Sequence, residues 1–375
     1  MQRIYFDNAA TTSLDPEVLE AMMPYLTSKF GNPSSVYSYG RETKMGIEAA
    51  RKSVSQLLNC APGELFFTSG GTEGTNTAIR AAIHDLKCQH IITSLIEHHA
   101  TLHTVEHYAS KGIPVSYVQL LPNGHIDLTH LETLLAEHPK SLVTLMHANN
   151  EIGNLLKVKK VGELCEKYGA IFHCDMVQTI GHYPIDLEKL NVHFAVASGH
   201  KFHGPKGVGV LYVNHQVAAK PMLMGGSQER NMRAGTENVY GIVGFAKALE
   251  LAMEHYERDS AKVLEVRNYM RDRLQQDFPM VTLNGDTGEH CLYTVLNVSF
   301  PMTDKLEMLL FNLDIAGVCT SGGSACSSGA STVSHVIKAL HPTTADTMIP
   351  VRFSFSKYNT KEEVDIVIEK LKSMM

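Results

Sequence analysis

A glycine-rich turn, an isolated acid and an isolated lysine each follow a predicted strand in this 375-residue chain. Residues 68–76 (TSGGTEGTN) place two adjacent glycines between a strand and a helix. Glycines allow close backbone approach, and a helix start offers free N–H groups and partial positive charge, so this turn can bind a phosphate. The pattern matches neither Walker A nor GxGxxG, and an ordinary strand-to-helix turn remains an alternative.

The isolated acid is Asp175, in residues 173–178 (HCDMVQ). It lies at the carboxyl end of a predicted buried strand, where α/β sheets place their ligands. A buried carboxylate is costly unless a cation or hydrogen-bond donors face it. A helix N-cap aspartate is the alternative interpretation.

The isolated lysine is Lys201, in residues 198–207 (SGHKFHGPKG). Apolar and imidazole neighbours favour the neutral amine of such a lysine, which can then form a Schiff base. A basic surface turn is the alternative, and we accept it for Lys206. A cofactor with a pyridine ring, an aldehyde and a phosphate requires an acid, a lysine and phosphate donors. The phosphate turn, Asp175 and Lys201 supply these three requirements in order.

A cysteine stands alone in the segment richest in small residues. In residues 320–331 (TSGGSACSSGAS), eleven of the twelve residues are Gly, Ser, Thr or Ala, and the exception is Cys326. Small residues have little to pack, which favours a segment that can move. A buried structural thiol is the alternative.

The elements that must position these residues alternate along the first two thirds of the chain. Strands are predicted at 65–68, 90–93, 142–147, 170–174, 194–198 and 208–213. Amphipathic helical patterns separate them, which predicts an α/β fold with a mostly parallel sheet covered by helices.

From about residue 255 the pattern changes to a long charged helix (255–278) and a strand (292–300). We predict a large domain at 14–255. A smaller α+β domain, made of 1–13 and 256–375, would carry the Cys326 segment.

Composition excludes several classes of protein. The 33 Lys and Arg residues against 39 Asp and Glu residues give a net charge of -6, which argues against direct nucleic-acid binding. No apolar run approaches the ~20 residues of a membrane span, and no secretory signal is visible. The seven cysteines are odd in number, scattered and without zinc-site spacing. We therefore expect no metal site and a reducing, cytoplasmic compartment.

Several ordered motifs resemble those of NifS-type cysteine desulfurases, which are pyridoxal-phosphate enzymes of fold type I in the class V aminotransferase group. The matching blocks are 5–12 (YFDNAATT), 30–35 (FGNPSS), 97–99 (EHH), 149–153 (NNEIG), 233–238 (RAGTEN), 324–328 (SACSS) and 351–354 (VRFS). The resemblance covers essentially the whole chain. It implies pyridoxal 5'-phosphate as cofactor and L-cysteine as substrate.

The resemblance also implies roles for residues at the cofactor. Lys201 would be the Schiff-base lysine, and Asp175 would hold the pyridinium nitrogen. The remaining cofactor contacts would be Gln178 and Asn150 at the phenolic oxygen, His98 stacked on the ring, and Gly71, Thr72, Ser198 and His200 at the phosphate. Thr236 resembles a phosphate contact donated across a dimer interface, which implies a homodimer.

At the substrate, Arg352 resembles the residue that binds the α-carboxylate, with Asn32 assisting. Cys326 would accept the sulfur as a persulfide, with His98 moving protons, while cysteine becomes alanine. The sulfur would pass to an acceptor protein such as an iron–sulfur scaffold or a carrier for tRNA thiolation. A selenocysteine lyase or another class V lyase or aminotransferase is the alternative enzyme, and a sulfur-binding scaffold is the non-enzymatic alternative.

Two positions depart from the family pattern, and several cysteines have no assigned role. Met176 stands where a small residue usually follows the aspartate, and Ser227 where a third glycine is common. The roles of Cys174 and Cys319 stay open. The remaining four cysteines, Cys60, Cys88, Cys165 and Cys291, are interpreted as packing residues.

Overall fold

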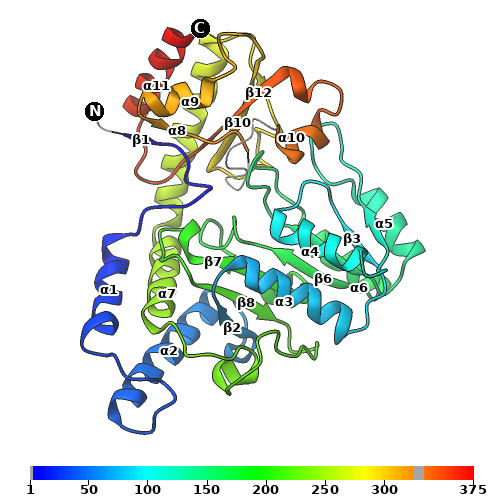
Figure 1. Ribbon diagram of the computed structural model, residues 1–375, viewed down its shortest axis with the longest axis vertical. Helices are drawn as coiled ribbons and strands as arrows, with labels where there is room; N and C mark the ends of the chain where they lie inside the picture. The colour runs from blue at the N-terminus through cyan, green and yellow to red at the C-terminus, as the bar shows by residue number, and fades with distance from the viewer. Residues whose placement is uncertain (1–2, 324–332) are drawn as a thin grey trace.

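The computed structural model describes residues 3–323 and 333–375, in which helices cover a central seven-stranded sheet (Figure 1). The strand order is β2-β8-β7-β6-β5-β3-β4. The strands are β2 (Leu65–Thr68), β3 (Ile91–Thr93), β4 (Val115–Tyr117), β5 (Leu142–Met146), β6 (Ile171–Asp175), β7 (Phe194–Ser198) and β8 (Gly209–Val213). Only β8 runs antiparallel to its neighbours, β2 and β7, so the predicted mostly parallel α/β sheet is confirmed.

The helices of this part of the chain precede, separate and follow these strands. They are α1 (Pro16–Thr27), α2 (Ser38–Leu57), α3 (Gly71–His84), α4 (His99–Ala109), α5 (Leu128–Glu137), α6 (Val158–Tyr168) and α7 (Val239–Glu254). The start of α1 has a local cause: the Asp15 side chain accepts from the backbone N–H of Glu17, and Pro16 occupies the first turn. Helix α7 packs against α1 and α2.

The rest of the chain forms a second, smaller unit of sheet and helix. Its strand order is β12-β10-β9, and a separate parallel pair joins β1 to β11. The elements are β1 (Ile4–Tyr5), α8 (Tyr256–Asp277), β9 (Thr282–Leu283), β10 (Val295–Pro301), α9 (Leu309–Ile315), β11 (Val318–Cys319), α10 (His335–Leu340), β12 (Met348–Ser354) and α11 (Lys361–Met374). The blue N-terminal trace passes from β1, beside this unit, to α1 beside the large sheet (Figure 1).

Six strands predicted from the sequence are present, each within two residues of its predicted ends. The sequence prediction missed β4, because its three residues are only partly buried and carry no apolar run. The predicted long helix corresponds to α8. The predicted strand 292–300 begins three residues late, because the backbone N–H of Val295 turns back to the carbonyl of Leu292 before pairing starts.

Two large hydrophobic clusters hold these elements together. The first involves residues from Val18 to Leu251, around the seven-stranded sheet. The second joins Ile4 and Phe6 to residues between Val263 and Leu371. The domain boundaries at 13/14 and 255/256 stay a prediction. Among the described helices, none is long and apolar enough to cross a membrane.

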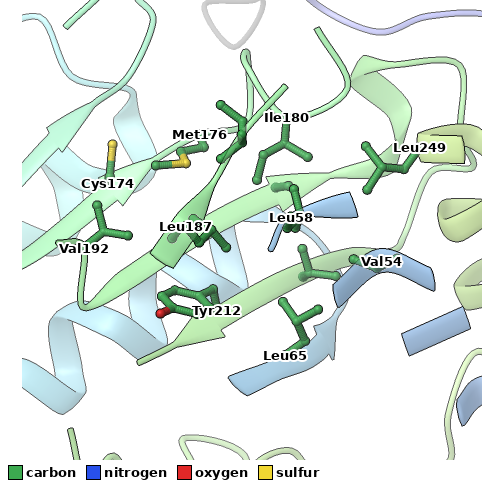
Figure 2. Packing of buried hydrophobic residues seen from close by; sticks show 14 of the residues in the cluster. Val54, Leu58, Leu65, Cys174, Met176, Ile180, Leu187, Val192, Tyr212 and Leu249 are labelled. Atoms are coloured by element: carbon green, nitrogen blue, oxygen red, sulfur yellow. The ribbon is translucent and has the colours of Figure 1, made fainter. Parts of the chain in front are cut away.

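The open question of Cys174 is answered by packing. Cys174 and Met176 lie in the first cluster with no exposed surface (Figure 2). Burial raises the pKa of the Cys174 thiol well above its usual range, so this cysteine is a packing residue. Met176 directly follows Asp175 in the chain and fills volume in this cluster. Ser227 is exposed before a short 3-10 turn, and nothing in the structure explains why a third glycine is absent there.

A buried ion pair fixes the segment that precedes Thr236. Arg51 on α2 makes two hydrogen bonds of 2.8 Å to the Glu229 carboxylate and one to the carbonyl of Leu65. The same carboxylate accepts from the backbone N–H of Phe67 in β2. Both side chains are almost fully buried, so each charge is compensated chiefly by the other.

We expect Glu229→Gln to lower the free energy of unfolding by about 3 kcal/mol, because the buried Arg51 guanidinium then keeps only the half-exposed Glu48 carboxylate, 3.4 Å from its Nε, as a compensating charge. The urea midpoint of the purified protein measures this. Lys189→Ala, which removes only the exposed pair with Asp186, is the control and should leave the midpoint unchanged. Equal midpoints for all three proteins would contradict the argument.

Candidate active site

The carboxyl ends of the parallel strands open into a cavity of about 470 Å³. Ten of the thirteen residues predicted for the site line it. They are Gly71, Thr72, His98, Asn150, Asp175, Gln178, Ser198, His200, Lys201 and Arg352. This volume lies within the usual range for a small-molecule or cofactor site.

One end of the cavity is built for an anion. Gly70 caps α3 with φ 152°, a conformation that favours glycine, and no described side chain caps the helix. A Cβ on Gly71 would lie 2.6 Å from the Cγ2 atom of Val177, so only glycine lets α3 start this close to the turn after β6. The uncapped N–H groups, with Thr72 and Ser198 beside them, suit a phosphate group.

Asp175 ends β6 and lines the same cavity while remaining only 8% exposed. Its Oδ1 accepts the backbone N–H of Val177 at 3.0 Å. Burial raises the pKa of its carboxyl group to about 6, although the Val177 hydrogen bond and the Lys201 charge act in the opposite direction. An acid held here is suited to a protonated ring nitrogen, which would supply the missing cation.

Lys201 ends the 3-10 turn Gly199–Lys201 that follows β7. Its Nζ donates to the backbone carbonyls of Ala9 at 2.6 Å and Ala10 at 2.8 Å. The side-chain amide of Gln178 donates to the same Ala9 carbonyl at 3.1 Å. The N-terminal segment therefore places the lysine amine within the cavity.

The orientation of His98 is set by the helix that it caps. Its Nδ1 accepts the backbone N–H of Ala100 at the start of α4, at 3.1 Å. Burial, with Lys201 and neighbouring histidines, lowers the pKa of His98 to about 4. The ring is therefore neutral, with its proton on Nε2. This geometry favours ring stacking and donation from Nε2, because Nδ1 is already occupied.

Arg352 on β12 reaches the cavity from the smaller unit and is 1% exposed. One terminal nitrogen donates to Asp7 Oδ1 at 2.7 Å, and the other donates to the carbonyl of Asn150 at 2.8 Å. Its Nε has no hydrogen-bond partner among the described residues. A buried guanidinium with an unused donor suits the carboxylate of a small substrate.

Two predicted residues lie outside this cavity, and a third is not described. Asn32 is exposed, and its side chain accepts the backbone N–H of Ser34. Thr236 is exposed and lines a separate pocket of about 160 Å³. Cys326 lies outside the described residues. The roles given to these three residues stay predictions.

Two residues at the site were missed by the sequence analysis. Glu97 is 1% exposed, and its Oε1 accepts from the hydroxyl of Ser94 and the backbone N–H of Met146. Burial raises the pKa of its carboxyl group to about 8. Asp7 orients Arg352, as described above. Both lie in sequence blocks that carry the family resemblance, which was the available signal for them.

A ring-nitrogen acid and a lysine on adjacent parallel strands, with a phosphate-binding helix start beside them, define a pyridoxal-phosphate enzyme of fold type I. The residues present fit this cofactor, since the uncapped helix start, the buried acid and the lysine amine share one cavity. Among the described residues, no group of three or more His, Cys, Asp or Glu side chains could hold a metal ion.

The chain belongs to the class V aminotransferase family, whose model matches residues 4–367. It is 41% identical over 370 residues to a protein named cysteine desulfurase from Trichormus azollae, covering 98% of this chain and 92% of that one. It is also 41% identical over 376 residues to a cysteine desulfurase IscS from Clostridium botulinum (strain Hall), covering 99% and 94%. A solved NifS-like protein has a TM-score of 0.91 and 37% identity, covering 100% and 99%.

The raised pKa of Asp175 predicts a pH-dependent stability of the cofactor-free protein. A carboxyl group with a pKa of about 6 in the folded state and 3.8 in the unfolded state stabilises the fold only while protonated. That stability is present below about pH 4 and is lost as the pH rises through 6. We expect cofactor-free Asp175→Asn to be more stable than the wild type by about 2 kcal/mol at pH 7.5.

Unfolding at pH 7.5 and pH 4 measures this difference, which should nearly vanish at the lower pH. If the stability difference between the wild type and Asp175→Asn were the same at both pH values, the carboxylate would not be the destabilising group. Asp304→Asn, at an exposed carboxylate, is the control for a general effect of the substitution.

Proposed function

We propose that this protein is a cysteine desulfurase that converts L-cysteine to L-alanine and transfers the sulfur to Cys326. The observation that carries the proposal is the convergence of Lys201, Asp175, His98 and Arg352 on one cavity. Relatives about 41% identical over nearly the whole chain bear the name cysteine desulfurase.

Pyridoxal phosphate, when bound, supplies an electron sink for bonds at the substrate's α-carbon. The chain's residues would hold it at four points. Asp175 would hold the ring nitrogen, and the start of α3 with Thr72, Ser198 and His200 would bind the phosphate. Asn150 and Gln178 would contact the phenolic oxygen, and the neutral His98 ring would cover one face.

The substrate would be oriented by charge and then deprotonated by the lysine. Arg352 binds the α-carboxylate through the donor that Asp7 and Asn150 leave available. Lys201 Nζ takes the proton from the α-carbon. The carbonyls of Ala9 and Ala10, both within hydrogen-bond distance, stabilise the resulting ammonium.

The Cys326 thiolate then attacks the substrate sulfur. The S–S bond forms as the C–S bond of the substrate breaks, the β-carbon gains a proton, and the α-carbon regains the proton held on Lys201. The products are alanine and a cysteine persulfide. The described residues on either side of this segment support the assignment. Ser334 donates to the Glu151 carboxylate, and a Cβ on Gly323 would lie 3.0 Å from the same carboxylate. Glu151 directly follows Asn150, so the chain leaves and rejoins the described structure beside the cavity.

The same proposal includes a dimer, a sulfur acceptor and a compartment. We propose a homodimer in which the exposed Thr236 of one copy contacts the phosphate bound by the other copy. The persulfide sulfur passes to an iron–sulfur scaffold or to a carrier for tRNA thiolation. A reducing cytoplasm suits a chain whose six described cysteines are all free.

We expect Cys326→Ala to keep the visible absorbance of the bound cofactor but to lose nearly all sulfide release from L-cysteine under reductant. Lys201→Ala should lose both signals, because it removes the amine that holds the cofactor and moves the proton. After incubation with cysteine, mass spectrometry of the wild type should find one added sulfur on the peptide that contains Cys326.

Cys60→Ser is the matched control, because burial raises the pKa of that thiol to about 12 and it lines a different cavity. It should retain full activity. Sulfide release that survives in Cys326→Ala would refute the role of Cys326. Turnover of selenocysteine without turnover of cysteine would replace the proposal by a selenocysteine lyase.

A further inference from the structure

A second, smaller cavity of about 50 Å³ lies behind the reactive lysine. Lys201, Gln178 and Ala9 line both this cavity and the cofactor cavity. His182 and Tyr293 line only the smaller one, so neither lines the space where a substrate would react.

His182 bonds the backbone of the lysine itself. Its Nε2 lies 3.1 Å from the carbonyl oxygen of Lys201, and its Nδ1 lies 3.3 Å from the hydroxyl of Tyr293. A carbonyl oxygen can only accept, so Nε2 carries the proton and donates. In a neutral ring Nδ1 then accepts, and the Tyr293 hydroxyl donates to it. Burial lowers the pKa of His182 to about 4, which keeps the ring neutral.

The neighbouring residues restrict the position of this contact. Gly181 has φ 85°, and a Cβ there would lie 2.3 Å from the Cγ atom of Phe202. The turn that carries His182 is therefore pressed against the residue that follows Lys201. This turn continues from Asp175 and Gln178, since the backbone N–H of His182 donates to the carbonyl of Thr179. Tyr293 lies just before β10, in the smaller unit of the fold.

We propose that His182 is a positioning residue for Lys201: it holds the lysine's backbone carbonyl and is itself oriented by Tyr293. The contact joins three parts of the chain, the turn after β6, the lysine turn after β7 and the start of β10. The placement of the lysine amine thus depends on the junction between the two units. Only the kinetic test rests on the proposed function, because cofactor binding does not depend on which amino acid is the substrate.

The test compares the holoenzymes of His182→Leu, His182→Gln and Tyr293→Phe with the wild type. Glutamine offers an N–H near the position of Nε2, whereas leucine offers none. We expect kcat for cysteine to fall on the order of 10-fold in His182→Leu with little change in KM, because the lysine is displaced and substrate binding is not. His182→Gln should stay within about 3-fold of the wild type, and Tyr293→Phe should fall about 3-fold.

A second readout is independent of turnover. The visible circular dichroism of the bound cofactor reports its orientation, and we expect it to change in His182→Leu and to be restored in His182→Gln. His193→Gln is the matched control: His193 is also a largely buried histidine that bonds a backbone group, the N–H of Phe172, but it lies at the amino end of β7, whereas Lys201 follows the carboxyl end of that strand. It should leave both readouts unchanged.

Equal losses in His182→Gln and His182→Leu would overturn the proposal, because the N–H donor would then be irrelevant. A His182→Leu protein that melts earlier but keeps the wild-type kcat and dichroism per folded holoenzyme would also overturn it. If His182→Leu does not fold, the decision falls to Tyr293→Phe, and wild-type values for both of its readouts would refute the coupling. Loss of desulfurase activity in every protein, the wild type included, would refute the proposed function and leave the dichroism test valid.

Discussion

The active site depends on one segment, Asp7 to Asp15, that is bonded to both units of the fold. The backbone N–H groups of Asn8 and Ala9 donate to Ser354 at the end of β12, and the Asp15 carboxylate accepts from Lys357. On the other side, Thr12 bonds the carbonyl of His200 through both its backbone and its hydroxyl. The segment therefore crosses from the small sheet to the lysine turn. One end and the middle of the segment each hold a residue of the site: Asp7 holds Arg352, and the carbonyls of Ala9 and Ala10 hold the Lys201 amine.

The fold compensates the charges of the site unequally. Asp175 and Glu97 are both acids with raised pKa values, and each lacks a cationic side chain bonded to it among the described contacts. Arg352, in contrast, is paired with Asp7 and a carbonyl. Under the proposed function, Asp175 would face a cationic ring nitrogen, and the Nε of Arg352 would remain for a substrate carboxylate. The charge of Asp175 that the protein leaves uncompensated would then be compensated by the cofactor.

The sequence predicted those features that depend on order along a strand. Asp175, Ser198 and Lys201 follow predicted buried strands, and a parallel sheet necessarily brings such ends to one edge. It did not predict contacts between distant segments. Nothing in the residues around Asp7 or Ala9 indicates that one would meet Arg352 and the other Lys201, since those contacts come from the path between the two units. Asn32 and Thr236 lie outside the cavity in the single chain, and the role predicted for Thr236 concerns a contact with a second copy.

The adjacency of β6 and β7 has a further consequence for how the site is held. The turn after β6 carries Asp175, Gln178 and His182 within eight residues, and the turn after β7 carries Ser198, His200 and Lys201 within four. Because the two strands are neighbours in a parallel sheet, a hydrogen bond between the turns costs little loop entropy. Gly181 then becomes necessary, since any side chain there would push the two turns apart at Phe202. The two adjacent turns can therefore orient Asp175 and Lys201 relative to each other. The N-terminal segment and Tyr293 fix the position of these turns relative to the smaller unit.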